Sequence, residues 1–183
     1  MGRPVAACLS ALAAGLLFTG AAAAQTGGAA APPKPFPTRV FKAWTLDCIV
    51  PKTGPTAGTR VCFIHHEAKA VSDPKLVAAR AVIRHSGPDR KLVLIIELPP
   101  NTVQASGASA VIDTNPPRQI AIAGCIPKFC YGAIEMTPDL EAAAKAGNQM
   151  TLSFTAKDQG AQTVAVPLAG VTAALAALAQ TGS

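Results

Sequence analysis

Short stretches in which apolar and polar residues alternate, separated by turns rich in glycine and proline, recur along most of this 183-residue chain. Side chains with a period of two lie on opposite faces of a strand, so such stretches predict half-buried strands. The continuous apolar run over 92–96, which ends at Pro99-Pro100, predicts a central strand with both faces covered. Short strands joined by turns favour an antiparallel arrangement over a parallel one. The clearest strand signals lie over 44–50, 60–65, 77–84 and 91–98, and further extended segments are predicted over 103–113, 119–125, 150–156 and 162–168.

Two segments carry a helical pattern instead. Thr137-Pro138, acidic residues in the following turn and Gly147 predict a short helix over about 138–146. Near the C-terminus, apolar side chains recur at spacings of three and four, which predicts a helix over about 171–179 with one buried stripe. The stripe consists of Leu168, Val171, Leu175 and Leu178, with Thr181 expected beyond its end.

The expected fold class is therefore mainly β: a single-domain antiparallel β-sandwich, or a barrel-like variant, with one short internal helix and a C-terminal helix. Trp44 is the only tryptophan, and it lies on the apolar face of its predicted strand. We expect its ring to be a core anchor rather than an exposed recognition residue.

The first 24 residues predict a secretory signal peptide. A lone charge at Arg3 precedes an apolar run over 5–18, and Ala22-Ala23-Ala24 supplies the small residues of a cleavage site before Gln25. Cys8 lies inside the apolar run rather than at the cleavage point, which argues against a lipid anchor. The prediction is an exported protein of the periplasm, with association to the outer membrane or the surface as a further option.

The mature chain is expected to divide into a tether and one domain. Residues 25–38 are rich in proline, alanine and glycine and lack apolar periodicity, which predicts an extended segment. The β domain is expected over 39–180, a length that can bury a core of its own. No later apolar segment is long and uncharged enough for a membrane span.

The charge of the chain is modestly basic and spread out. Its formal net charge is +6, and loss of Arg3 with the leader leaves 15 basic against 10 acidic residues. The sequence has no run of five basic residues and few aromatic ones, which argues against binding to nucleic acid. The expected partner is an envelope or surface protein or an anionic envelope surface.

Four cysteines remain after the leader, and in an oxidising compartment they are expected to form disulfides. Four cysteines allow three pairings, and spacing alone does not choose among them. Cys48 and Cys62 lie on two successive predicted strands, and Cys125 and Cys130 bracket a segment just long enough for a tight turn. We therefore predict the pairs Cys48 with Cys62 and Cys125 with Cys130.

Several motifs in this order resemble the invasion-associated locus B family, over about residues 39–178. The family consists of secreted, envelope-associated proteins of alphaproteobacteria, and pathogenic members have a role in host-cell invasion. The resemblance implies no catalytic residues, and the chain has His65-His66 where members often have glutamine. The motifs are Phe41-x-x-Trp44-x-x-x-Cys48, Cys62, Leu98-Pro99 ahead of Ile112-Asp113, Cys125 to Cys130, and Leu168-x-Gly170-x-x-x-Ala174-Leu175.

His65, His66 and Glu67 are the residues that most suggest chemistry, because Cys62 and His65 have a C-x-x-H spacing that can hold a metal. On a strand, however, the two histidines face opposite sides, and an oxidised Cys62 offers no thiolate. The pair Cys125 and Cys130 has four intervening residues, whereas redox motifs usually have two, which favours a structural bridge.

The predicted function is therefore that of an exported, non-enzymatic binding or interaction protein of the envelope, without a cofactor, linked to host-cell interaction or envelope maintenance. No nucleophile motif or phosphate loop is present, and the sequence alone does not bring Glu97, Asp113 and Glu135 together. The alternative is a periplasmic metal-binding factor or enzyme that uses His65, His66 and Glu67. A further alternative is a chaperone-like module that offers an open strand edge.

Overall fold

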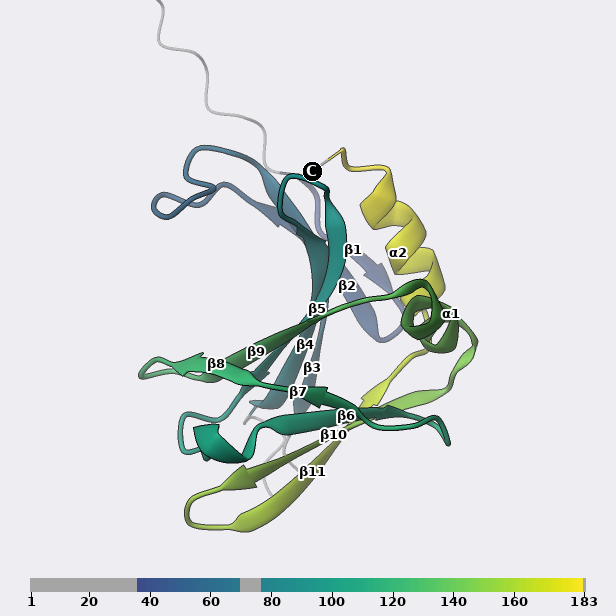
Figure 1. Cartoon of the computed structure of the whole chain (residues 1–183). Helices are drawn as coiled ribbons and strands as arrows, with labels where there is room; N and C mark the ends of the chain where they lie inside the picture. The colour runs from purple at the N-terminus through teal and green to yellow at the C-terminus, as the bar shows by residue number, and fades with distance from the viewer. Residues whose placement is uncertain (1–35, 70–76, 183) are drawn as a thin grey trace, which may run out of the picture. The chain divides into compact units, whose positions relative to one another are not determined.

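The computed structural model describes residues 36–69 and 77–182. The predicted signal peptide (1–24) and the predicted tether before residue 36 lie outside this part of the chain. The described strands form two antiparallel sheets, which we call the large and the small sheet (Figure 1). The large sheet has the order β1 (Arg39–Phe41), β2 (Trp44–Ile49), β3 (Val61–Lys69), β4 (Val77–Ser86), β5 (Lys91–Leu98), β9 (Cys130–Glu135) and β8 (Ile122–Cys125).

The small sheet and two helices complete the domain, and the sheets do not close into a barrel. The predicted mainly β antiparallel sandwich with two helices is therefore confirmed, and the barrel-like variant is not what the chain forms. The remaining elements are β11 (Gly160–Pro167), β10 (Gln149–Ala156), β6 (Ala108–Ile112) and β7 (Arg118–Ile120) in sheet order, the helices α1 (Pro138–Ala146) and α2 (Val171–Ala179), and a short 3-10 turn (Gln104–Ser106).

The core forms where the apolar positions of successive strands come into register. Leu46, Ile64, Ile83 and Leu94 stand directly opposite one another across β2, β3, β4 and β5, and all four are buried. Because side chains alternate along each strand, this register sends every second residue to the same inner face. The inner faces of both sheets and both helices share one hydrophobic cluster.

Helix α1 has the predicted bounds, but the residues at its two ends do not make the predicted capping interactions. Thr137 occupies the N-cap position without a side-chain cap, because its hydroxyl donates to the Asp139 carboxylate instead. Gly147 follows the helix with an ordinary negative φ of −78°. Its missing side chain matters for packing, since a Cβ there would lie 2.7 Å from Cγ2 of Ile112.

Helix α2 lies beside β1 and β2 and covers part of the inner face of the large sheet (Figure 1). The predicted stripe is confirmed: Leu175 is 6% exposed, and the other three members are buried as well. Thr181 lies beyond the end of α2, as expected, but it is not at the surface. Its side chain is buried because the chain turns back after α2, and its hydroxyl donates to the carbonyl of Leu178 at 2.7 Å.

The two ends of the domain meet at the start of β2. Trp44 is completely buried, as predicted, and its Nε1 donates to the carbonyl of Pro167 at 3.0 Å. The backbone N–H of Ala43 donates to the carbonyl of Ala169. Gly170 has a φ of 93°, and a Cβ there would lie 2.0 Å from the carbonyl oxygen of Phe41, so no other residue fits this approach.

One predicted extended segment, 119–125, divides between the two sheets. Strand β7 pairs with β6 in the small sheet, and β8 pairs with β9 in the large sheet. The break falls at Ala121, where a Cβ on Gly132 would lie 2.4 Å from the Ala121 carbonyl oxygen. The 3-10 turn over Gln104–Ser106 was likewise not anticipated within its predicted extended segment.

Strand β5 is central, as predicted, because it lies between β4 and β9. Its outer-face residues Val93 and Ile95 are only partly buried, so a second covering layer is absent from the described structure on that side. No helix in the described ranges is long and apolar enough to cross a membrane.

Candidate functional site

The four cysteines lie in the two predicted pairs. Cys48 stands directly opposite Cys62 on β2 and β3, and Cys125 stands opposite Cys130 on β8 and β9. The Sγ atoms are 2.02 Å apart in each pair, and the Cα atoms are 4.0 and 3.9 Å apart. Both bridges therefore join neighbouring strands of the large sheet, one toward each of its edges.

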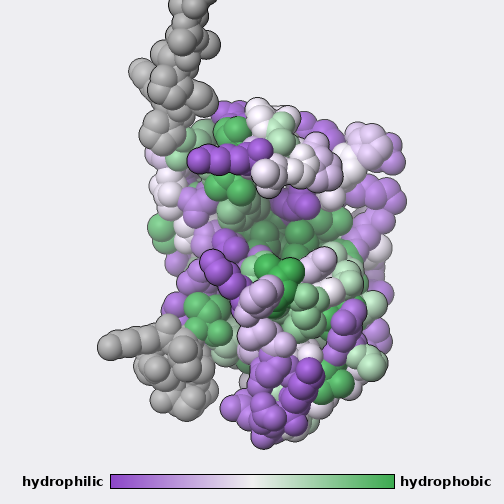
Figure 2. All heavy atoms as spheres, turned by 90° about the vertical axis from the view of Figure 1, so that its left-hand side faces the viewer, coloured by the Kyte–Doolittle hydropathy of each residue, from purple (hydrophilic) through white to green (hydrophobic). Residues whose placement is uncertain are grey.

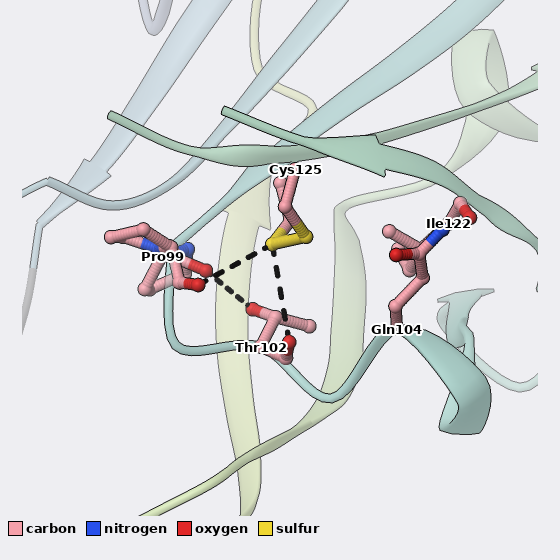
Figure 3. Close-up of a disulfide and its surroundings, with 7 residues drawn as sticks. Pro99, Thr102, Gln104, Ile122 and Cys125 are labelled. Atoms are coloured by element: carbon pink, nitrogen blue, oxygen red, sulfur yellow. Dashed lines mark hydrogen bonds between the residues drawn. A yellow bond between two sulfur atoms is a disulfide. The ribbon is translucent and has the colours of Figure 1, made fainter. Parts of the chain in front are cut away.

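The Cys125–Cys130 bridge lies against the segment that follows β5 (Figure 3). Cys130 is completely buried, and its Sγ is 3.6 Å from the carbonyl oxygen of Pro100 and 3.9 Å from that of Thr102. The hydroxyl of Thr102, also buried, donates to the carbonyl of Pro99 at 2.7 Å. Backbone carbonyl groups of this segment therefore lie around the buried sulfur of Cys130.

Strand β8, which pairs with β9 in this hairpin, also contacts the segment that follows β5. The side-chain amide of Gln104 donates to the carbonyl of Ile122 at 3.2 Å (Figure 3). Cys125 is exposed and continues into a tight turn rather than a helix, so no helix N-terminus lies at its sulfur to stabilise a thiolate. This environment is that of a structural bridge.

His65 and His66 point to opposite faces of β3, as their neighbouring positions require. On the outer face, Nε2 of His65 lies 2.9 Å from Oδ2 of Asp47. On the inner face, Nδ1 of His66 lies 2.7 Å from the Ala43 carbonyl oxygen, and its ring is tilted against that of Trp44 with centroids 6.2 Å apart. The two rings therefore do not converge on one ion.

Glu67 lies on the outer face, where Lys69 is 3.2 Å and Arg80 3.9 Å from its carboxylate. Cys62 is bonded to Cys48 and offers no thiolate. The described residues contain no group of three side chains of the kinds that bind metals. His65, His66 and Glu67, the candidates of the metal-binding alternative, thus do not converge on one point.

The outer face of the large sheet does assemble a polar chain across four successive strands. From β2 to β5 its members are Asp47, His65, Arg80 and Glu97. Nε of Arg80 donates to Nδ1 of His65 at 3.5 Å, and Nη1 of Arg80 donates to Glu97 at 3.4 Å. The Arg80 guanidinium also lies over the Phe63 ring, 5.6 Å from its centroid.

This chain fixes the tautomer of His65 and the charge of Asp47. Because Arg80 donates to Nδ1, the ring proton of neutral His65 is on Nε2 and is donated to Asp47. Partial burial acts to raise the pKa of Asp47, but hydrogen bonds from Thr38 and His65 and the nearby positive charge of Arg80 lower it below 3.8. Asp47 is consequently ionised at neutral pH.

An apolar centre lies beside the polar chain. His65, Val82, Ile95 and Ala133 stand opposite one another across β3, β4, β5 and β9. Val82 is 6% exposed although it lies outside the main core cluster. Figure 2 shows this side of the molecule, with hydrophobic atoms gathered in the middle and hydrophilic atoms around them.

The outer face of the small sheet is different. Its side chains are small, and the central ones carry hydroxyl groups rather than charges. Ser153 on β10 stands opposite Thr163 on β11 and Ser109 on β6. Thr151 and Thr155 flank Ser153 on the same face, and no outward-facing position of these three strands is charged.

The candidate catalytic residues do not come together in the described part of the chain. The hydrogen bonds of the His65 ring go to Asp47 and Arg80, so among the described residues it holds no hydroxyl or thiol nucleophile. Asp113, Glu97 and Glu135 each have a different partner and do not form one site. Asp113 accepts the backbone N–H groups of Asn148 and Gln149, whereas Glu97 and Glu135 pair with Arg80 and Lys91.

The polar chain was not predicted, although the sequence contains a signal for it. Asp47, Arg80 and Glu97 each occupy the outward position of a strand whose inward positions are apolar. Alternation alone therefore places these residues on the outer face. Their contact depends on the register between strands, which local sequence does not specify.

Comparison with known proteins agrees with this fold. A family model described as "Invasion associated locus B (IalB) protein" matches residues 44–179. The crystal structure of invasion associated protein B from Bartonella henselae is similar, with a TM-score of 0.65 and 20% sequence identity, over 79% of this chain and 97% of that chain. No curated protein matches significantly. The family match covers most of the chain, and the protein therefore belongs to the invasion associated locus B family.

Proposed function

We propose that the protein is an exported, non-enzymatic binding protein of the cell envelope, and that it binds its partner with the outer face of the large sheet. One observation carries the proposal. This face holds an ion-paired network beside the partly exposed Val93 and Ile95, and no described element packs over it. Ordered apolar and aromatic side chains among fixed charges are typical of a recognition surface.

Export is supported by the leader and the cysteines together. Residues 1–24 have the composition of a secretory signal, and the four remaining cysteines lie at disulfide distance. Such bridges persist in the periplasm or outside the cell and are rare in the cytosol. We place the protein in the periplasm, or in association with the outer membrane or surface. We link it to host-cell interaction, which the name of its family suggests, or to envelope maintenance.

A non-enzymatic role is supported by what the outer face offers. Its carboxylates are engaged in ion pairs, and its histidine is held between Asp47 and Arg80. A general base needs a reacting proton within reach, and a nucleophile needs a base beside it. The contacts of this network are those of a rigid polar surface rather than of a reacting group.

Site-specific photo-crosslinking in living cells tests the binding face. Tyr131 projects from β9 on the outer face of the large sheet and is 39% exposed, so a benzophenone amino acid can replace it. Ala165, exposed on the outer face of the small sheet, is the matched control. We expect an adduct of higher mass from position 131 and none from position 165.

Each other outcome has a defined meaning. Adducts of equal yield at positions 131 and 165, or no adduct at position 131, would contradict the proposal that this face binds the partner. An adduct at position 165 alone would favour the open-edge alternative, because β11 is an edge strand of eight residues. Cell fractionation tests the compartment, and mass spectrometry of the recovered protein tests cleavage of the leader. We expect the chain to start at Gln25, and a retained leader would contradict export.

A further inference from the structure

We propose that the partner presents an acidic side chain flanked by apolar residues, and that this carboxylate pairs with Arg84 in the outer face of the large sheet. The inference rests on the proposed binding function and specifies the chemistry of the partner. It follows from the one cationic side chain on this face that forms no ion pair with a described carboxylate.

Arg84 lies within β4, directly opposite Val93 on β5. It is partly buried, and its Nη1 donates to the carbonyl of the adjacent His85 at a long 3.4 Å. No carboxylate of the described part of the chain lies within 4.0 Å of it. Most of its donors therefore remain available to a ligand.

Every carboxylate on the same face already has a cationic or hydrogen-bonding partner. Asp47 pairs with His65, and Glu97 pairs with Arg80. The other two pairs are Glu67 with Lys69 and Glu135 with Lys91, at 3.2 and 2.9 Å. Arg84 is thus the one cationic side chain of this face without an ion-pair partner among the described residues, and its planar guanidinium can bind a carboxylate with two parallel hydrogen bonds.

The surroundings of Arg84 favour a protein segment over a small anion. Four hollows in the described surface have volumes of about 260 to 360 Å³, and Arg84 lines none of them. Small ligands prefer concave sites that enclose most of their surface. A broad face on which the partly exposed Val93 and Ile95 accompany Arg84 instead suits apolar side chains that flank an acidic residue.

The same charges argue against an anionic membrane as the occupant. A membrane surface attracts clusters of basic residues and repels carboxylates within a Debye length. Here four carboxylates share the face with Arg84. A protein segment, in contrast, can bring one carboxylate to Arg84 and keep its other charges away from the four carboxylates of the face.

Selection from a random dodecapeptide library on the mature protein tests the inference. We expect the selected peptides to contain aspartate or glutamate between apolar residues. Arg84→Gln should weaken their binding at least tenfold, and so should replacement of the peptide's acidic residue by its amide. Combining the two changes should give little further loss, because both remove the same pair. Arg39→Gln, which removes an exposed positive charge from β1, should leave binding unchanged.

Three results would overturn the proposal: no selected binders, binders without an acidic residue, or binders that do not distinguish Arg84→Gln from the parent. Binding of phosphatidylglycerol vesicles that depends on Arg84 would also overturn it, in favour of a lipid. Thermal melts of Arg84→Gln must match the parent, so that loss of binding is not loss of fold. Crosslinks from position 131 would persist if only the acidic partner were wrong, which separates this failure from failure of the binding function.

Discussion

The two sheets differ most on the faces that they turn away from the core. The large sheet carries Asp47, His65, Arg80 and Glu97 in one connected network, whereas the small sheet carries uncharged Ser, Thr and Ala side chains. Both sheets fill the same core with their inner faces. The difference teaches that the shared core does not require a charged network on an outer face, so the chemistry of the outer large-sheet face needs another explanation.

The covalent cross-links show the same asymmetry. Both cysteine pairs join strands of the large sheet, and none joins strands of the small sheet. A bridge on each side of β4 and β5 limits how far the edges of the large sheet can splay. The sheet with the more elaborate outer face is thus also the one whose geometry is fixed.

The largest effect is expected where α2 covers the inner face of the large sheet. Leu175→Asp would place an unpaired carboxylate in the core, and we expect it to lower the free energy of unfolding by several kcal/mol. Ala173→Asp introduces the same side chain at an exposed position in the first turn of α2, where a negative charge is favourable. Thermal and urea unfolding of the two variants measure the difference.

Equal melting of Leu175→Asp and the parent would mean that α2 is not packed on the domain. The apolar stripe of the helix would then become a partner surface of its own. In that case the comparison between the two outer faces would no longer identify the binding side.

Removal of the bridges should have the next largest effect. In the chain-entropy model, Cys48→Ala with Cys62→Ala costs about 3 kcal/mol, and Cys125→Ala with Cys130→Ala costs about 2 kcal/mol, since the second loop is shorter. Urea unfolding measures both values. Peptide mapping without reduction tests the pairs directly, and a peptide joining Cys48 to Cys125 or Cys130 would contradict them.

Exchanging one residue between the two outer faces should have a smaller, asymmetric effect. Val82→Ser puts a hydroxyl where an apolar side chain is nearly buried, and we expect it to cost about 1–2 kcal/mol. Ser153→Val on the central strand of the small sheet should change stability by at most about 0.5 kcal/mol. Similar costs for both variants in thermal melts would show that the apolar centre is not special.

The smallest effect is expected from the polar chain, and it depends on pH. Because the folded state lowers the pKa of Asp47 below 3.8, ionised Asp47 stabilises the fold above that pH, and the contribution disappears as the pH falls further. Asp47→Asn should therefore cost up to about 1 kcal/mol at pH 7 and almost nothing near pH 2. A cost that stays constant between these pH values in urea unfolding would exclude the electrostatic explanation.

Local patterns in the sequence predicted much of the fold. Alternation identified the strands around Trp44 and Val82, and turn residues identified the hairpins that bring the cysteines opposite each other. The bounds of both helices were predicted within the precision of such patterns. These features depend on residues only a few positions apart, which is why sequence alone specifies them.

Features that depend on distant segments could not be predicted in this way. The passage of the chain between sheets at Ala121 requires the close approach of Gly132. The burial of Thr181 depends on how the chain folds back after α2, and the network of Asp47, His65 and Arg80 depends on the register of three strands. None of these contacts leaves a local periodicity.

The hydrogen bond from Trp44 to Pro167 spans 123 positions of the chain and has a consequence for the order of folding if the chain is exported as proposed. The strand that begins at Trp44 cannot finish packing until the last elements, β11 and α2, have emerged. On the proposed route across the inner membrane, the N-terminal strands would stay incompletely folded until translocation is almost complete. A topology of this kind delays premature folding while the chain is still threading through a narrow channel.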